Sequence, residues 1–416
     1  MPGSNATQDV VICGSGNNWG SLYTAVHKMN RTVVGGEDAT VGLGGLIQNG
    51  GHGLLSSHYG LASDQVYQVT VITTEGRRFV ANDVQSQDLF WAVRGAGGGQ
   101  YGVITEFVLK THPVPANVVA GGLAFYPAQN SNASGQASWN AMAEAAAQIP
   151  DLMDNGLTGT LIALTKKKAM SYLGLTQELP GVSAIFSLTG FNMTTKEMHA
   201  TLNRLADQLS VGNVNITLQS PSSQGYWSST KPDPLTSASS GAVSLMTSHL
   251  LGRRELSNIA KGRLVTYLQD IMVAQDPTAG SMLLFGLQAG RGTASVPEER
   301  RGSTLPAWRT AYAHTMAYGA SVNATVDPSH ALRAGADWLD ATQEPVWKEW
   351  APESGSYMNE GNPFASNWKH DFYGENYGRL LEIKHKYDPT GSLFVWSGVG
   401  SDEWTHDLNS GLLCRV

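Results

Sequence analysis

Glycine is concentrated in one short part of this chain, and that concentration constrains how the backbone can run. Six of the twelve residues from 42 to 53 are glycine, and the whole sequence has 47 glycines among 416 residues. Glycine lacks a Cβ atom, so its backbone can adopt positive φ and can approach a ligand closely. A tight loop explains two or three of these glycines well, but explains six less well. The pattern therefore favours a backbone that lies against a flat or anionic ligand.

The overall composition argues against several classes of partner. Charged residues make up 15% of the chain, below the roughly 25% of an average soluble protein. The formal net charge is -7, and no stripe of lysine or arginine offers the basic face that nucleic-acid phosphates require. No run of residues approaches the ~18 apolar residues of a membrane span. We therefore expect neither nucleic acid nor membrane as a partner. We also expect a monomer.

The sequence does not decide whether the protein is secreted or whether its two cysteines form a disulfide. Glycosylation sequons of the form Asn-x-Ser/Thr begin at Asn5, Asn30, Asn132, Asn192, Asn215 and Asn323. The first residues lack the basic and apolar regions of a signal peptide, so we expect a secreted protein only if a full-length form carries one. Cys13 and Cys414 lie near opposite ends of the chain, and they either pair or remain free thiols.

The pattern of predicted secondary structure changes at two points along the chain. Alternating β-branched residues predict a hairpin over 65–80 and a strand over 102–115, which ends in two prolines. Beyond residue 115, strand-like segments alternate with amphipathic helices, and one helix begins at a capping box formed by Thr194 and Glu197. This mixture predicts an α+β domain in which helices cover an antiparallel sheet. The expected divisions are 1–115, 116–350 and 351–416, and the last segment is expected to return to the first.

Two glycine motifs resemble phosphate-binding fingerprints without their structural context. Gly14, Gly16 and Gly20 lie between a predicted strand and a predicted helix. Their spacing is one residue too long for a dinucleotide fingerprint, and the further βαβ units of such a fold do not follow. The segment 97–102 has the correct letters but leads into a strand, so it offers no helix N-terminus to a phosphate.

The histidines give no metal-binding pattern in the sequence. His52 and His58 are six residues apart in the glycine-rich segment, and His314 and the other histidines are scattered. No His-x-x-x-His pair on a helix and no pair of neighbouring cysteines accompanies them. We therefore expect isolated, hydrogen-bonded histidines and no metal site.

Long segments at both ends of the chain resemble one known family. Residues 35–66 read GGEDATVGLGGLIQNGGHGLLSSHYGLASDQV, and residues 102–115 read GVITEFVLKTHPVP. In the tail, YMNE at 357–360 precedes NWKHDFYGENYGRLLEIKHKYDPTGSLF at 367–394. These segments resemble the FAD-linked oxidases of the berberine-bridge-enzyme group, which have a PCMH-type FAD-binding domain within the vanillyl-alcohol-oxidase-like superfamily. The middle of the chain resembles the family only in its alternation of predicted strands and helices.

The resemblance implies a role for each residue that matches a family motif. The residues implied to contact FAD are Asp38, Thr40, Val41, Gly42, Gly45, Gly50, Gly51, His52, Gly53, Gly102, Val103, Asn376 and Tyr377. Tyr357 and Asn359 would face the substrate. Tyr357 is the leading catalytic candidate, with a buried structural tyrosine as the alternative. Backbone N–H groups near the flavin would stabilise its reduced form, and glycine permits that contact.

Two departures from the family pattern concern the cofactor. Bicovalent members carry a cysteine where this chain has Asp38, so no thioether to the flavin can form at this position. The family's FAD domain also begins with a further segment that includes a flavin-anchoring histidine, and this chain starts after it. We therefore expect an FAD domain that is incomplete at its N-terminus, and FAD that is non-covalently held if it is bound.

The resemblance implies an oxidase that removes a hydride from a small molecule of secondary metabolism, with dioxygen as the electron acceptor. A general base that the sequence does not identify would take the accompanying proton. Two alternatives stay open. One is a flavin-independent cyclase or isomerase that uses only the substrate pocket. The other is an inactive remnant in which Val10 and Val11 lie on an unpaired sheet edge.

Overall fold

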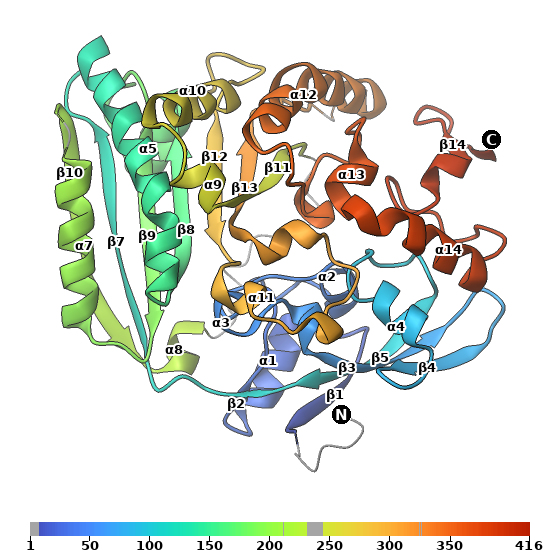
Figure 1. The fold of residues 1–416 in the computed structure, drawn as a ribbon. Coiled ribbons are helices and arrows are strands. Elements are labelled where there is room, and N and C mark those ends of the chain that lie inside the picture. Colours follow the sequence, from blue (N-terminus) through green and yellow to red (C-terminus); the bar gives the residue numbers. More distant parts are fainter. Residues whose placement is uncertain (1–7, 211, 231–243, 324, 326) are drawn as a thin grey trace.

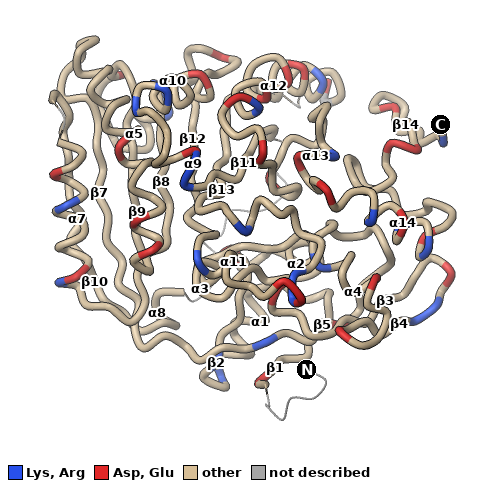
Figure 2. Tube along the Cα trace, in the orientation of Figure 1, with Lys and Arg blue, Asp and Glu red and all other residues tan. Residues whose placement is uncertain are grey.

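The computed structural model describes residues 8–210, 212–230, 244–323, 325 and 327–416, which build two main sheets (Figure 1). The first hundred or so of these residues supply the smaller sheet, and the middle of the chain supplies the larger one. Acidic and basic residues are dispersed over the whole trace (Figure 2). Within the described ranges, no helix is both long enough and apolar enough to cross a membrane. The expected combination of helices with antiparallel sheets is confirmed.

The smaller sheet has four antiparallel strands in the order β1-β5-β3-β4. They are β1 (Val10–Gly14), β3 (Val66–Ile72), β4 (Arg78–Asn82) and β5 (Val103–Lys110). Strands β3 and β4 form the predicted hairpin, in which Gly76 has a φ of 74°. The strand predicted over 102–115 is divided, because its last part, β6 (His112–Pro113), leaves this sheet to pair with β2 (Arg31–Thr32).

Helices from both ends of the chain pack on the smaller sheet. They are α1 (Trp19–His27), α2 (Leu43–Gln48), α4 (Gln87–Ala92), α13 (Trp368–Tyr373) and α14 (Tyr377–Tyr387). One hydrophobic core joins Trp19 and Phe107 from the first part of the chain with Phe372 and Leu380 from the tail. The tail is therefore part of the core of the smaller sheet, and Figure 1 shows its red helix α14 beside the blue α4.

The larger sheet has seven strands in the order β10-β7-β9-β8-β12-β13-β11, and each neighbouring pair is antiparallel. The strands are β7 (Val118–Pro127), β8 (Leu157–Leu164), β9 (Ser183–Phe191), β10 (Val214–Gln224), β11 (Thr247–Gly252), β12 (Met282–Leu287) and β13 (Ala311–Tyr318). Four long helices pack with these strands around the main core, namely α5 (Asn132–Asp154), α7 (Thr195–Leu209), α10 (Lys261–Ile271) and α12 (Pro328–Trp350).

The capping box predicted from sequence begins α7. The Thr194 hydroxyl accepts a hydrogen bond from the Glu197 N–H at 3.2 Å, and the Glu197 carboxylate accepts one from the Thr194 N–H at 2.7 Å. These two bonds satisfy N–H groups that the first helical turn leaves without partners. The helix then buries its apolar face against the larger sheet through Met198, Leu202, Leu205 and Leu209.

The remaining elements of the described chain are short helices and one small hairpin. Helical segments are α3 (Ser56–Tyr59), η1 (Ala62–Gln65), α6 (Lys166–Leu173), α8 (Tyr226–Thr230), α9 (Arg253–Leu256), α11 (Arg291–Ala294), η2 (Glu298–Arg300), η3 (Pro306–Arg309), η4 (Met358–Glu360), η5 (Gly374–Asn376) and η6 (Ser401–Glu403). Strands β14 (Trp404–His406) and β15 (Leu413–Arg415) form a small hairpin near the end. Cys13 and Cys414 are both free thiols. The division into 1–115, 116–350 and 351–416 stays a proposal.

A buried carboxyl on α12 predicts how stability depends on pH. Glu344 is 5% exposed and accepts a hydrogen bond from the Asn362 side chain at 3.1 Å. Burial raises its pKa from 4.5 to about 7, with the negative charge of Asp371 acting in the same direction. Between these two values the folded state keeps a proton that the unfolded state releases. Stability conferred by the protonated group is therefore lost as pH rises through this window, by roughly 3 kcal/mol in total.

We expect the Glu344→Gln variant to lack this component of the pH dependence, because the amide has nearly the same shape and does not titrate. Thermal melts of wild type and variant between pH 4.5 and 7.5 would measure it. The melting temperature of the wild type should fall relative to that of the variant as pH rises. Parallel curves would contradict a protonated Glu344 in the folded protein.

Candidate functional site

The glycine-rich segment contains two physically different kinds of glycine. A Cβ atom on Gly51 would lie 2.2 Å from a Leu46 methyl group, and one on Gly53 would lie 1.9 Å from the Gly35 carbonyl oxygen. These two positions need glycine because the chain packs against itself. Cβ atoms on Gly42 and Gly45 would meet no heavy atom of a described residue within 4 Å. We call Gly42 and Gly45, which lie at the start of α2, the glycine wall.

The glycine wall forms one side of a cavity of about 620 Å³. Its lining comes from the glycine-rich segment and from the tail, and comprises Gly36, Glu37, Asp38, Val41, Gly42, Gly45, Leu46, His52, Tyr357, Asn359 and Glu360. A second cavity of about 390 Å³ shares Gly36, Glu37 and Asp38 with the first and extends to α1 and α8. There, the His27 and Trp227 rings stack with their centroids 4.0 Å apart. The backbone at 36–38 therefore separates two adjoining cavities.

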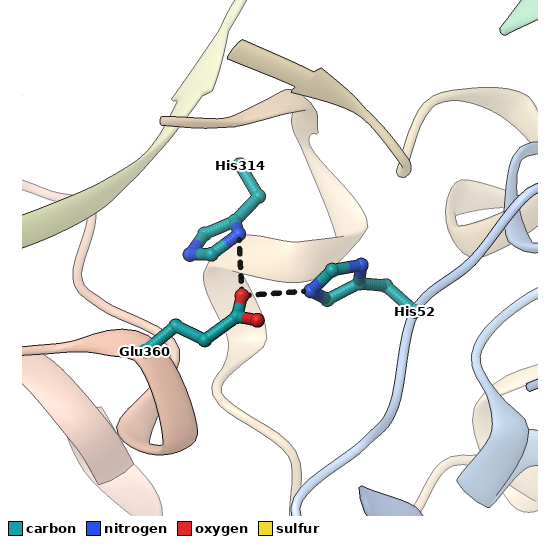
Figure 3. A group of neighbouring side chains, drawn as sticks. All are labelled: His52, His314 and Glu360. Carbon is teal, nitrogen blue, oxygen red and sulfur yellow. Dashed lines mark hydrogen bonds and ion pairs between the residues drawn. The ribbon is translucent and has the colours of Figure 1, made fainter. Parts of the chain in front are cut away.

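Beside this cavity, two imidazole side chains approach one oxygen of the Glu360 carboxylate (Figure 3). The Glu360 Oε2 atom lies 3.0 Å from His52 Nε2 and 3.3 Å from His314 Nδ1. His52 follows the two glycines at positive φ, His314 lies on β13 of the larger sheet, and Glu360 ends η4 in the tail. We call these three residues the His–Glu cluster. All three of its ligand atoms lie within 4.8 Å of one another, so the cluster could hold a metal ion.

The environment gives each member of the His–Glu cluster a different charge. Burial opposes ionisation of Glu360, but the neighbouring imidazoles outweigh it and hold its pKa at about 2. For His52, burial also opposes the charge, but the Glu360 charge and hydrogen bond raise its pKa overall. Burial lowers the pKa of His314 to about 3, so this imidazole is neutral. The Glu360 carboxylate therefore favours the protonated form of His52, while the neighbouring His314 stays uncharged.

The tyrosine predicted to face the substrate packs against both histidines. Tyr357 is 3% exposed, and its ring meets the rings of His52 and His314 edge to face, with centroids 5.2 and 5.5 Å apart. Its hydroxyl accepts a hydrogen bond from Asn359 Nδ2 at 2.7 Å, and the same amide group reaches the Gly45 carbonyl oxygen at 3.3 Å. Burial and the Glu360 charge raise the Tyr357 pKa well above its ordinary value, so its phenol stays neutral.

The structure brings about half of the predicted site residues to the larger cavity. They are Asp38, Val41, Gly42, Gly45, His52, Tyr357 and Asn359. Thr40 lies next to them and donates through both its N–H and its hydroxyl to Asp38 Oδ1 at 2.7 Å. This contact orders the turn that precedes the glycine wall.

The other predicted residues do not line the cavity. Gly50, Gly51 and Gly53 shape the bend below it, and Gly102 and Val103 lie at the start of β5. The Val103 side chain is 62% exposed. Asn376 donates to the Ser303 and Thr304 carbonyl oxygens, and Tyr377 bonds to Asp402. The sequence motifs identify these residues, but in the described chain they contact other residues and do not line the cavity.

Two residues of the His–Glu cluster were not among the predicted site residues. Glu360 belongs to the YMNE motif, but no role follows for it from the motif letters alone. His314 was expected to be an isolated histidine, and that expectation is wrong. It lies at the centre of a regular strand, where the alternation of residues signals only a buried position. The pairing of β13 with β11 and β12 places His314 beside His52 of the glycine-rich segment.

Comparisons with known proteins match both ends of this chain. A family model for berberine and berberine-like proteins matches residues 356–395, and one for an FAD-binding domain matches residues 4–82. The FAD-linked oxidoreductase patO of Penicillium expansum is 32% identical over 95% of this chain and 64% of the relative. The protein of the same name from Aspergillus clavatus is 30% identical over 99% of this chain and 67% of the relative. The chain thus spans about two thirds of the length of these curated relatives.

Solved structures with the same architecture agree with these matches. The VAO-type flavoprotein MtVAO713 from Myceliophthora thermophila C1 has a TM-score of 0.86 at 24% identity, covering 98% of this chain and 69% of its own. MtVAO615 from the same organism has a TM-score of 0.79 at 26% identity, covering 99% and 71%. The expected fold of the vanillyl-alcohol-oxidase type, with a PCMH-type FAD-binding domain, is confirmed. The chain belongs to the berberine-bridge-enzyme-like family of FAD-linked oxidoreductases.

Proposed function

We propose that this protein is an FAD-dependent oxidase that acts on a small hydroxylated or heterocyclic molecule of secondary metabolism, with dioxygen as electron acceptor. The observation that carries the proposal is the cavity that is lined both by the glycine wall and by the hydrogen-bonded pair of His52 and Glu360. Relatives named as an FAD-linked oxidoreductase and a VAO-type flavoprotein oxidase support it. When bound, FAD supplies the acceptor for the hydride that leaves the substrate.

The residues of the glycine wall fit a flat cofactor. Because a Cβ on Gly42 or Gly45 would meet nothing within 4 Å, a planar ring can approach their backbone directly. The cavity volume of about 620 Å³ lies within the roughly 300–1,000 Å³ usual for ligand sites. Asp38, Val41, Gly42 and Gly45 are the residues that would hold FAD on this side. The carboxylate of Asp38 cannot form a thioether, so the cofactor is non-covalent at this position.

Glu360 and His52 would orient the polar group of the substrate. Both histidine contacts end on Glu360 Oε2, and Oε1 makes no hydrogen bond to any residue that the structure describes (Figure 3). In this proposal Oε1 accepts a hydrogen bond from a substrate hydroxyl and so directs the adjacent C–H bond toward the glycine wall. The Tyr357 ring, held through its hydroxyl by Asn359, closes the same side of the cavity and excludes water from it.

The glycine wall predicts a selective loss of FAD binding in the Gly45→Ala variant. A methyl group there would occupy space that the flat ring needs. Gly262→Ala on α10 is the matched control, because it is also a helical glycine whose Cβ would meet nothing within 4 Å. Both changes should leave thermal stability equal or higher, since alanine favours helix more than glycine.

Binding of FAD by each purified protein can be followed by quenching of flavin fluorescence. We expect Gly45→Ala to weaken binding by at least about tenfold, equivalent to ~1.4 kcal/mol, and Gly262→Ala to leave it unchanged. Acid precipitation should release all bound flavin. Wild-type protein that binds no FAD, or that turns over a substrate without it, would overturn the proposed function and favour a cyclase or isomerase.

The proposed role of Glu360 predicts a catalytic defect in the Glu360→Gln variant. The amide keeps the size of the side chain but removes the charge that fixes His52 and the substrate hydroxyl. Misplacement of a bound group by about 1 Å can cost about 100-fold in rate, so we expect a loss of this size in kcat/KM. The matched control is Glu403→Gln, which changes a surface His–Glu pair with His385 at 2.7 Å. Oxygen consumption with bound FAD measures both variants, and equal losses would contradict the assignment.

We further propose that the protein is secreted and N-glycosylated. The five sequon asparagines within the described residues, Asn30, Asn132, Asn192, Asn215 and Asn323, are all exposed, and Asn5 lies outside the described residues. Protein produced through a eukaryotic secretory pathway should lose mass on treatment with an N-glycan endoglycosidase. Replacement of the five asparagines by glutamine should remove most of this difference, and an unchanged mass in the wild type would refute glycosylation.

A further inference from the structure

We propose that His52, His314 and Glu360 together bind one divalent first-row transition-metal ion at the edge of the proposed substrate cavity. Two imidazoles and one carboxylate are a ligand set that zinc, iron and related ions use in proteins. The three residues come from the glycine-rich segment, from β13 and from η4, so the folded chain, and not a local motif, assembles the set. The proposal goes beyond the oxidase function and does not require bound FAD.

The spacing of the ligand atoms matches a metal site. Bonds from zinc to histidine nitrogen and carboxylate oxygen measure about 2.0–2.2 Å, so neighbouring ligands of a tetrahedral site lie roughly 3.3–3.5 Å apart. The Glu360 Oε2 atom is 3.0 Å from His52 Nε2 and 3.3 Å from His314 Nδ1. In Figure 3 both rings direct these nitrogens toward the same carboxylate. Small side-chain rotations would therefore admit an ion between them.

His314 supplies an independent indication of a missing ligand. Its side chain is fully buried, and neither ring nitrogen makes a hydrogen bond to a residue that the structure describes. Polar atoms buried in a protein normally have partners, and an unpartnered one calls for an explanation. A cation bound to Nδ1 would provide that partner. Neutral imidazole is also the form that ligates metals.

The charge of the cavity favours a cation, and its shape leaves the ion accessible. Glu37 and Asp38 line the cavity together with Glu360, whereas the lining residues within the described chain include no lysine or arginine. The side chains of His52 and Glu360 are 18% and 34% exposed. Three protein ligands that leave one position open toward a cavity are the arrangement of catalytic zinc sites. Water or a substrate oxygen would occupy the open position.

Cobalt(II) is the probe for this site, because its visible absorption reports tetrahedral coordination. Purified full chain without added FAD would be freed of metal with a chelator and titrated with Co²⁺, followed by displacement with Zn²⁺. We expect one Co²⁺ per chain, with visible bands that disappear when zinc replaces it. Elemental analysis of the dialysed protein would confirm the stoichiometry. Because the spectrum belongs to the metal, failure of FAD binding would leave this result unaffected.

Variants separate the proposed site from adventitious binding. We expect Glu360→Gln and His314→Asn each to weaken Co²⁺ binding by at least about 100-fold, since even changes outside the ligand shell cost about 10- to 100-fold. Glu403→Gln, in the exposed pair with His385, should keep wild-type affinity. Circular dichroism and thermal melts identify any variant that fails to fold, and the near-isosteric Glu360→Gln remains informative if His314→Asn does. Absence of a one-to-one complex in the wild type, or unchanged affinity in folded Glu360→Gln, would overturn the proposal.

Discussion

The ionised carboxylate of Glu360 is the interaction on which the arrangement of this molecule depends. A charge held among aromatic rings is tolerable only when partners compensate it, and removal of one partner leaves the others buried without compensation. Here the partners come from the glycine-rich segment and from the larger sheet. The carboxylate therefore ties the tail to the glycine-rich segment and to the larger sheet. The buried pair between Arg309 and Asp64, with contacts of 2.8 and 2.9 Å, likewise joins η3, which precedes β13, to η1, which follows the glycine-rich segment.

The glycine-rich segment serves two needs that the sequence alone does not separate. Gly51 and Gly53 allow the chain to pass close to itself, and this close passage places His52 beside Glu360. Gly42 and Gly45 leave their backbone bare toward the cavity. Internal packing explains why Gly51 and Gly53 are glycine. Only Gly42 and Gly45 require a ligand as the explanation. Only Gly42 and Gly45, and not all six glycines of the segment, therefore indicate a cofactor.

Local patterns predicted local structure well. The hairpin of β3 and β4 and the start of α7 follow from β-branched alternation and from a capping box, because both depend on residues close in sequence. The family motifs likewise led to Tyr357 and Asn359, which line the cavity. His314 could not be found in this way. Its neighbours in the strand are small or apolar, and its partners lie far away in sequence. Its importance arises only from the register of the larger sheet.

The motif that contains Asn376 and Tyr377 illustrates the opposite limit. Its residue types match the family, yet the polar groups of both side chains form hydrogen bonds within the protein. Asn376 donates to the carbonyl groups of residues 303 and 304, and Tyr377 donates to Asp402. A motif records that a residue type suits a position, but it does not say which of several neighbours that residue contacts. The geometry of the tail decides that question. In the described chain it directs Asn359 and Glu360, and not α14, to the cavity.

The backbone at 36–38, which separates the two cavities, has a mechanical consequence. Residues 36–38 belong to the walls of both cavities, and the stacked rings of His27 and Trp227 line the smaller one. At this shared wall, a shift of the backbone that enlarges one cavity would reduce the other. Glu37 restrains the partition through its 3.0 Å hydrogen bond from Gln288, the residue that follows β12. The end of a strand in the larger sheet thus holds the wall between the two cavities in place.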